Sequence, residues 1–151
     1  PTVRLERYKR YSDTASWFLK DVWEMNLTAT TAEKVEENNR FVKLVFPVYE
    51  NHTWNGNAMN ILGEQEYEYN NIHEPFTINS ISFDSTLLVK QKIVDFLIKE
   101  SYQVERYAKN VGMIYKRFKE VDKVFVPSNP SLDSIVSGLD YTYSIISYGN
   151  N

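Results

Sequence analysis

The first residue of this chain that could do chemistry is its N-terminal proline. A free proline amine can act as a general base when it lies at the end of a buried strand, inside a pocket. The start PTVRL alternates apolar residues as such a strand would, but the next residues, ERYKRYSDTASWF, have helical spacing. We therefore interpret Pro1 as the product of initiator-methionine removal rather than as a catalytic group.

Histidines and glutamates are the next candidates, as metal ligands. His52 and His73 are the two histidines of the chain; they fall on separate predicted loops, without an HxH or HExxH spacing, and surface histidines are expected there. Glu64, Glu66 and Glu68 recur at every second position and could chelate a divalent ion from one strand face. Such a pattern is more often a solvated face that protects a sheet edge. We predict no catalytic residue, no metal and no cofactor.

The composition is that of a globular chain without cysteine chemistry. Of the 151 residues, 42% are hydrophobic and 25% are charged, which is close to the average of folded domains. The absence of cysteine excludes disulfides, thiolate metal sites and cysteine nucleophiles. No apolar run approaches the roughly 18 residues of a membrane span. The net charge of −3 argues against general nucleic-acid binding.

The charge is unevenly distributed, which points to contacts between proteins. The opening segment carries Arg4, Arg7, Lys9 and Arg10 against Glu6 alone. Basic residues among tyrosines are also used on nucleic acid, but a solvated helix face or a contact with an acidic protein is the favoured interpretation. The acidic remainder of the chain could itself be that partner, in a ring of identical subunits.

Two further features complete the candidate interface. Trp54 lies in a loop rich in Asn and Gly, where an exposed tryptophan is a common interface anchor. The acidic strand face offers a complement to the basic N-terminus. The candidate contact residues are Arg4, Arg7, Arg10, Trp54, Glu66 and Glu68.

The elements that would position these residues include two predicted helices. Apolar residues recur at steps of three and four over residues 4–24, and again over about 85–109, where Ser85 is a plausible N-cap. Alternating apolar residues predict strands elsewhere. The predicted strands are FVKLVFPVY, FTINSISF, GMIYKRF, KVFVP and a final one in GLDYTYSIISYG, with a turn or short helix over 132–138 before the last.

These elements predict an α+β fold. A mostly antiparallel sheet would pack against the long helix of about 85–109, with the N-terminal helix in addition. Because neither a linker nor an internal repeat is visible, we predict one domain over residues 1–151. A terminal strand this well formed must be paired or covered, either within the domain or by a neighbouring subunit.

The order of the elements resembles that of the tail-terminator family and other small ring proteins of tailed-phage necks. The pieces that carry the resemblance are RLERYKRYSDTASWFLKDVW, FVKLVFPVY, FTINSISF, LLVKQKIVDFLIKES and GLDYTYSIISYG. The resemblance implies a non-enzymatic virion protein, assembled in the host cytoplasm. Six or twelve copies would form a ring that joins tail-tube and connector proteins and lets DNA pass, without contact to a membrane.

Two alternatives from other classes stay open. One is a small binding protein of the immunity type, which would present an acidic face to a basic partner. The other is an enzyme that works through Pro1, as in the tautomerase superfamily.

Overall fold

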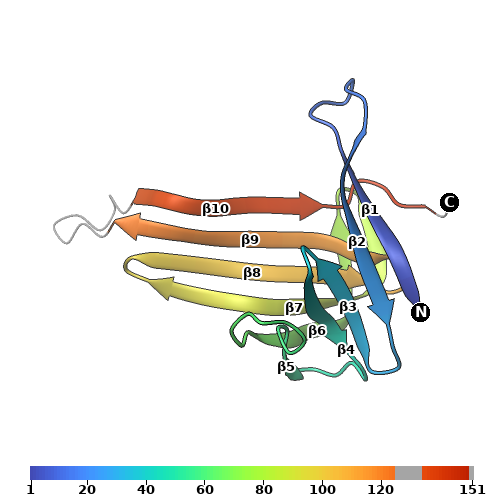
Figure 1. The fold of residues 1–151 in the computed structure, drawn as a ribbon, viewed down its shortest axis with the longest axis horizontal. Helices are drawn as coiled ribbons and strands as arrows, with labels where there is room; N and C mark the ends of the chain where they lie inside the picture. Colours follow the sequence, from blue (N-terminus) through green and yellow to red (C-terminus); the bar gives the residue numbers. More distant parts are fainter. Residues whose placement is uncertain (125–133, 150–151) are drawn as a thin grey trace. The chain divides into compact units, whose positions relative to one another are not determined.

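Every regular element that the structure describes is a β-strand. The computed structural model describes residues 1–124 and 134–149, and this part contains ten strands and no helix (Figure 1). The strands are β1 (Thr2–Lys9), β2 (Phe18–Leu27), β3 (Thr31–Glu36), β4 (Asn39–Val45), β5 (Thr53–Asn55), β6 (Glu66–Ile78), β7 (Ile81–Phe96), β8 (Lys99–Ala108), β9 (Gly112–Val124) and β10 (Ser134–Ser144). The predicted α+β fold is therefore wrong, and the fold is all-β.

The strands form two sheets in which neighbours along the chain are neighbours in space. The first sheet has the order β1-β2-β3-β4 and the second the order β10-β9-β8-β7-β6-β5. The chain divides into two compact units: Pro1–Pro47 with Trp54–Gln65, and Val48–Thr53 with Glu66–Asn151. Each unit is described here by itself, and the single domain stays a prediction.

The predicted N-terminal helix over residues 4–24 is a hairpin. Strands β1 and β2 pair antiparallel from Thr2 opposite Asn26 to Lys9 opposite Phe18. Residues 10–17 form the loop between the strands. The apolar residues of the two strands and the loop happen to be spaced three or four positions apart, and this spacing was interpreted as one face of a helix.

The predicted long helix over about 85–109 is also a hairpin, made of β7 and β8. Leu97 and Ile98 form its turn, and the register shifts between Lys90 and Lys92. The bulge and the turn interrupt the period of two, so that the apolar residues fell at helical spacing. Ile93, one of the residues of the supposed helical stripe, is in fact exposed.

Several predicted strands are confirmed, with changes of extent. FVKLVFPVY contains the end of β4, and the alternating C-terminal run is β10. FTINSISF is split by a turn at Asn79 and Ser80, both with positive φ. GMIYKRF and the start of KVFVP are parts of β9; residues 125–127 of the latter, and 132–133 of the predicted turn, lie outside the described residues, while 134–138 belong to β10.

Buried apolar side chains lie in both sheets. In the six-stranded sheet Phe83, Ala108 and Ile114 are buried together. The partly buried residues packed on them are Phe76, Ile78, Ile81, Val111, Tyr115 and Ile145. The buried apolar side chains of this sheet outside that cluster are Tyr67, Tyr69, Val89, Val104 and Val121. In the four-stranded sheet the buried apolar side chains are Ala32 and Val42. Many large apolar side chains are also exposed, and they bear on function.

Candidate interaction surfaces

The basic residues of the N-terminal segment are largely neutralised by acids of the same segment. Each of the three predicted contact arginines has a carboxylate partner on β1, on β2 or in the loop between them. The pairs are Arg4 with Glu6 (2.9 Å), Arg7 with Asp21, and Arg10 with Asp13 (2.8 Å). The predicted basic face for an acidic neighbour is thus weaker than the sequence implies.

The remaining predicted contact residues lie apart from these arginines in the chain. The indole Nε1 of Trp54, on β5, donates to the carbonyl of Val42 at 2.9 Å, and the side chain is half-buried. Trp54 therefore folds back onto its own unit. Glu66 and Glu68 lie on β6 and alternate there with the buried Tyr67. Glu66 is exposed and Glu68 is half-buried, whereas Glu64, the third glutamate of the predicted acidic face, lies before the strand.

The residues considered for catalysis or metal binding do not converge. Pro1 is exposed and its carbonyl accepts a hydrogen bond from the amide of Leu27 at 2.8 Å, so it lacks the buried strand end that the catalytic hypothesis requires. The ring of His52 stacks on Tyr49 with centroids 4.1 Å apart. His73 Nδ1 is 3.1 Å from the hydroxyl of Ser85.

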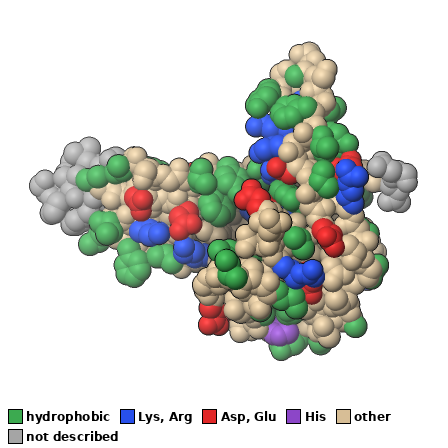
Figure 2. Space-filling view, in the orientation of Figure 1, with side chains coloured by type: hydrophobic (Ala, Val, Ile, Leu, Met, Phe, Trp, Pro, Cys, Tyr) green, Lys and Arg blue, Asp and Glu red, His purple; other side chains and the backbone are tan. Residues whose placement is uncertain are grey.

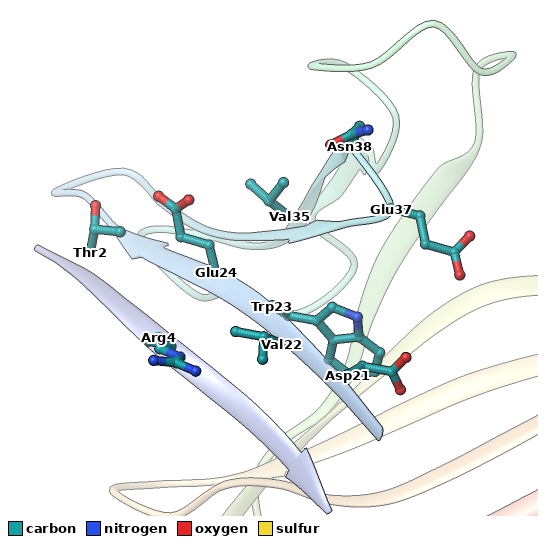
Figure 3. A pocket seen from close by; sticks show the side chains of 9 residues that line it. All are labelled: Thr2, Arg4, Asp21, Val22, Trp23, Glu24, Val35, Glu37 and Asn38. Atoms are coloured by element: carbon teal, nitrogen blue, oxygen red, sulfur yellow. The ribbon is translucent and has the colours of Figure 1, made fainter. Parts of the chain in front are cut away.

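A pocket of about 630 Å³ lies on the four-stranded sheet (Figure 3). Its lining comes from β1, β2, β3 and the turn after β3. The lining residues are Thr2, Arg4, Asp21, Val22, Trp23, Glu24, Val35, Glu37 and Asn38. Carboxylates, one guanidinium, a hydroxyl and an amide could bind a polar group, but the set contains no nucleophile with an adjacent base.

The six-stranded sheet holds a buried glutamate, Glu105, whose partners lie on strands of the same sheet. Glu105 of β8 is 2% exposed; it accepts a hydrogen bond from the Tyr107 hydroxyl at 2.7 Å and lies 3.2 Å from Lys116 Nζ. Burial of its hydroxyl, and then the charge of Glu105, raise the pKa of Tyr107 well above its usual value. The arrangement is satisfied internally, so it stabilises the sheet.

Strand β10 is held firmly along the edge that faces β9. The ring of Tyr141 stacks on Phe118 with centroids 5.1 Å apart, and the guanidinium of Arg117 pairs with Asp140. This hydrogen bond lowers the pKa of Asp140. Gly138 has a φ of 124°, and a Cβ there would overlap the carbonyl oxygen of Glu120. Side chains and backbone thus fix the register of β10 on β9.

No strand of the described residues 1–124 and 134–149 pairs with the opposite edge of β10. The strand is the last in the order of its sheet, and nearly all its described side chains are exposed. Its eleven residues carry one charge, Asp140, whereas the eight residues of β1 carry four. Natural edge strands are usually protected by charges, so a long and almost uncharged edge is a template for pairing with another chain. The alternation in the sequence predicted the strand but not its place at an edge.

Comparison of the chain with protein-family models, curated proteins and solved structures gave no match. Among the residues the structure describes, no group of three or more His, Cys, Asp or Glu side chains is placed to hold a metal ion. No helix in the same residues has the length and apolar character needed to span a membrane.

Proposed function

We propose that this chain is a non-enzymatic structural protein that associates with a second copy of itself through the outer edge of β10. The observation that carries the proposal is the length and lack of charge of this edge, which ends a sheet and is left open. The edge offers main-chain donors and acceptors to an extended strand, the mode of binding known as β-augmentation.

A second copy fits this edge because the strand is compatible with itself. A two-fold axis through Leu139, at the centre of β10, would pair the whole strand with its copy in antiparallel order. Asp140 would then lie opposite Gly138 of the other copy, so that the two carboxylates do not face each other. Each Asp140 is in addition already neutralised by Arg117.

Side chains on one face would reinforce such a pair. Leu139, Tyr141 and Tyr143 alternate along β10 and share a face. Leu139 and Tyr143 are exposed, and pairs of aliphatic and aromatic side chains across strands stabilise a sheet. The two six-stranded sheets would become one continuous sheet.

The phage neck ring stays a prediction, as do its tail-tube and connector partners, the passage of DNA and the virion location. The two helices on which the resemblance partly rested are hairpins. A closed ring of six or twelve copies would require a second contact besides β10. The outer edge of β1 is available for it, but is charged.

The test compares two lysine substitutions at leucines of equal exposure. Leu139 in β10 is 61% exposed and Leu97 in the β7–β8 turn is 62% exposed. We expect sedimentation velocity to show a concentration-dependent dimer for the unchanged protein and for Leu97→Lys. For Leu139→Lys we expect dimerisation to be weakened about tenfold or more, because like charges would face each other across the new strand pair.

Two outcomes contradict the proposal. One is a monomer at every concentration. The other is a dimer that Leu97→Lys disrupts and Leu139→Lys leaves intact, which would place the contact at the β7–β8 turn. Far-ultraviolet circular dichroism of both variants checks that the sheets are retained.

A further inference from the structure

The end of the β1–β2 hairpin is an exposed surface of aromatic and basic side chains that self-association does not use. We call residues 8–20 the tip segment. Every large apolar side chain of this segment is exposed, including Tyr11 at 78% and Trp17 at 59%. These side chains are Tyr8, Tyr11, Trp17, Phe18 and Leu19. Figure 2 shows hydrophobic and basic side chains gathered over this end of the hairpin, at the top of the view.

The apolar side chains lie on both faces of the ribbon at the same level. Tyr8 pairs with Leu19, and the next pair along the hairpin is Lys9 with Phe18. Successive residues of a strand point to opposite faces, so Tyr8 and Leu19 share one face and Phe18 lies on the other. Tyr11 joins Phe18, with ring centroids 5.6 Å apart. A partner that lies against one face would leave the other face exposed to water.

Basic side chains lie next to the aromatic rings of the tip segment. The ammonium of Lys9 lies 4.5 Å from the ring centroid of Tyr11, and the guanidinium of Arg10 lies 4.6 Å from that of Trp17. With Lys20 the segment has three cations and one acid, Asp13, so its net charge is positive. The tip therefore complements a surface that is apolar inside and negatively charged outside.

The loop that carries these groups is ordered by its own hydrogen bonds. Arg10 donates from Nη1 to the carbonyl of Asp13 and from Nη2 to its carboxylate, both at 2.8 Å. The amide of Ala15 donates to the carbonyl of Ser12 at 3.2 Å. The rings are thus presented by an ordered turn, which lowers the entropic cost of binding.

We infer that the tip segment inserts into the headgroup region of a lipid bilayer that contains anionic lipids. A bilayer closes around an inserted hairpin and covers both faces at once, which a flat protein surface cannot do. Tryptophan and tyrosine favour the membrane–water interface, and basic side chains next to them reach the headgroups. The resemblance to ring proteins implied no membrane contact, and the sequence has no apolar run long enough to span a membrane; shallow insertion of a hairpin needs no such run.

Vesicle binding tests the inference with the full chain. We expect the protein to co-sediment with vesicles of phosphatidylcholine and phosphatidylglycerol, and to bind pure phosphatidylcholine vesicles more weakly. Trp17→Ala is expected to reduce binding about tenfold, because it removes one large apolar side chain from the inserted surface. Phe96→Ala, at an aromatic residue that is 70% exposed outside the tip segment, is the matched control and is expected to bind normally.

A second variant tests whether the basic side chains contribute to vesicle binding. Lys9→Gln with Lys20→Gln keeps side-chain size and removes two cations, and should lower binding to the anionic vesicles with little effect on the neutral ones. Absence of binding to both kinds of vesicle would overturn the inference and favour a protein partner for the tip. Binding that Trp17→Ala and Phe96→Ala reduce equally would also overturn it. The dimerisation test through Leu139 is independent of either result.

Discussion

The outer strands of the two sheets, β1 and β10, stand in the same topological position but differ in charge. β1 carries Arg4, Glu6, Arg7 and Lys9, and its register with β2 shifts near its end. Charges and bulges both discourage pairing with another chain. β10 carries Asp140 alone, although its register with β9 also shifts, between Ile135 and Ser137. The two edges therefore differ in charge and not in the presence of a bulge. The comparison teaches that one edge is protected against assembly and the other is left available for it.

The two sheets also differ in the exposure of the cation that pairs with their buried glutamate. Glu33 of the four-stranded sheet is 3% exposed and accepts hydrogen bonds from Thr31 and Arg40, both at 2.7 Å. Glu105 of the six-stranded sheet instead lies beside Tyr107 and Lys116. The cation of the first pair is 41% exposed and that of the second 21% exposed. Loss of Lys116 should therefore reduce stability more than loss of Arg40.

The largest expected effect is that of Lys116→Met. The substitution removes the ammonium that lies 3.2 Å from the buried carboxylate of Glu105, which should lower the free energy of unfolding by about 3 kcal/mol. The matched variant Arg40→Met should cost only about 1 kcal/mol, because the guanidinium is more exposed than the ammonium of Lys116 and both Thr31 and Asn26 still donate to Glu33. Urea unfolding of both variants measures the difference, and equal losses would remove this contrast between the sheets.

Gly138→Ala should have the next largest effect. Its φ of 124° disfavours any side chain, and the new Cβ would overlap the carbonyl of Glu120. We expect a loss of about 2 kcal/mol and weaker dimerisation, because β10 can no longer hold its register on β9. Gly63→Ala is the control, since nothing lies within 4 Å of its added Cβ. A neutral Gly138→Ala would show that β10 is not fixed in the described way.

Alkaline pH should destabilise the six-stranded sheet. Burial and the charge of Glu105 raise the pKa of Tyr107 in the folded state. Above pH of about 10 the unfolded chain loses this proton while the folded chain keeps it, so stability falls as the pH rises. Tyr107→Phe should flatten this decline in unfolding experiments between neutral and alkaline pH. An unchanged slope would assign the decline to other groups.

Acidic pH should destabilise the four-stranded sheet through protonation of Glu33. The hydroxyl of Thr31, which donates to Glu33, lowers the pKa of this carboxyl from its usual value of 4.5, with Arg40 and Asn26 acting in the same direction. A lowered folded-state pKa gives stability that is present above about pH 4.5 and is lost as the pH falls further. Glu33→Gln should be less stable at neutral pH but lose less stability on acidification. A parallel decline in both proteins would contradict this assignment.

The smallest expected effect comes from removing the protection of β1. Arg4→Thr with Glu6→Thr replaces two charges of the edge by residues that favour strands. We expect weak new association, about tenfold weaker than that through β10, because Arg7, Lys9 and the bulge remain. Analytical ultracentrifugation of this variant on a Leu139→Lys background detects it. Association as strong as that through β10 would show that charge does not distinguish the two edges.

The sequence predicted individual strands better than the fold. Period-two alternation identified β10 because a single strand carries that signal locally. The two hairpins were taken for helices because a bulge or a loop shifted the phase of the pattern. Which strand ends a sheet depends on pairings between distant residues, so the open edge of β10 had no local signal. The ion pairs that neutralise Arg4, Arg7 and Arg10 likewise follow from the hairpin and not from a helix.

A cysteine scan of β10 tests the central claim most directly, because the chain has no cysteine of its own. Residues 136, 137 and 139–142 are replaced singly, with Gly138 kept because a side chain there would overlap the carbonyl of Glu120. Disulfide-linked dimers are measured after mild oxidation, with Leu97→Cys as the control of equal exposure. The account predicts a maximum of cross-linking at position 139 that falls off to both sides, because only the central residue lies opposite its own copy. No cross-linking along β10, or cross-linking only at position 97, would contradict it.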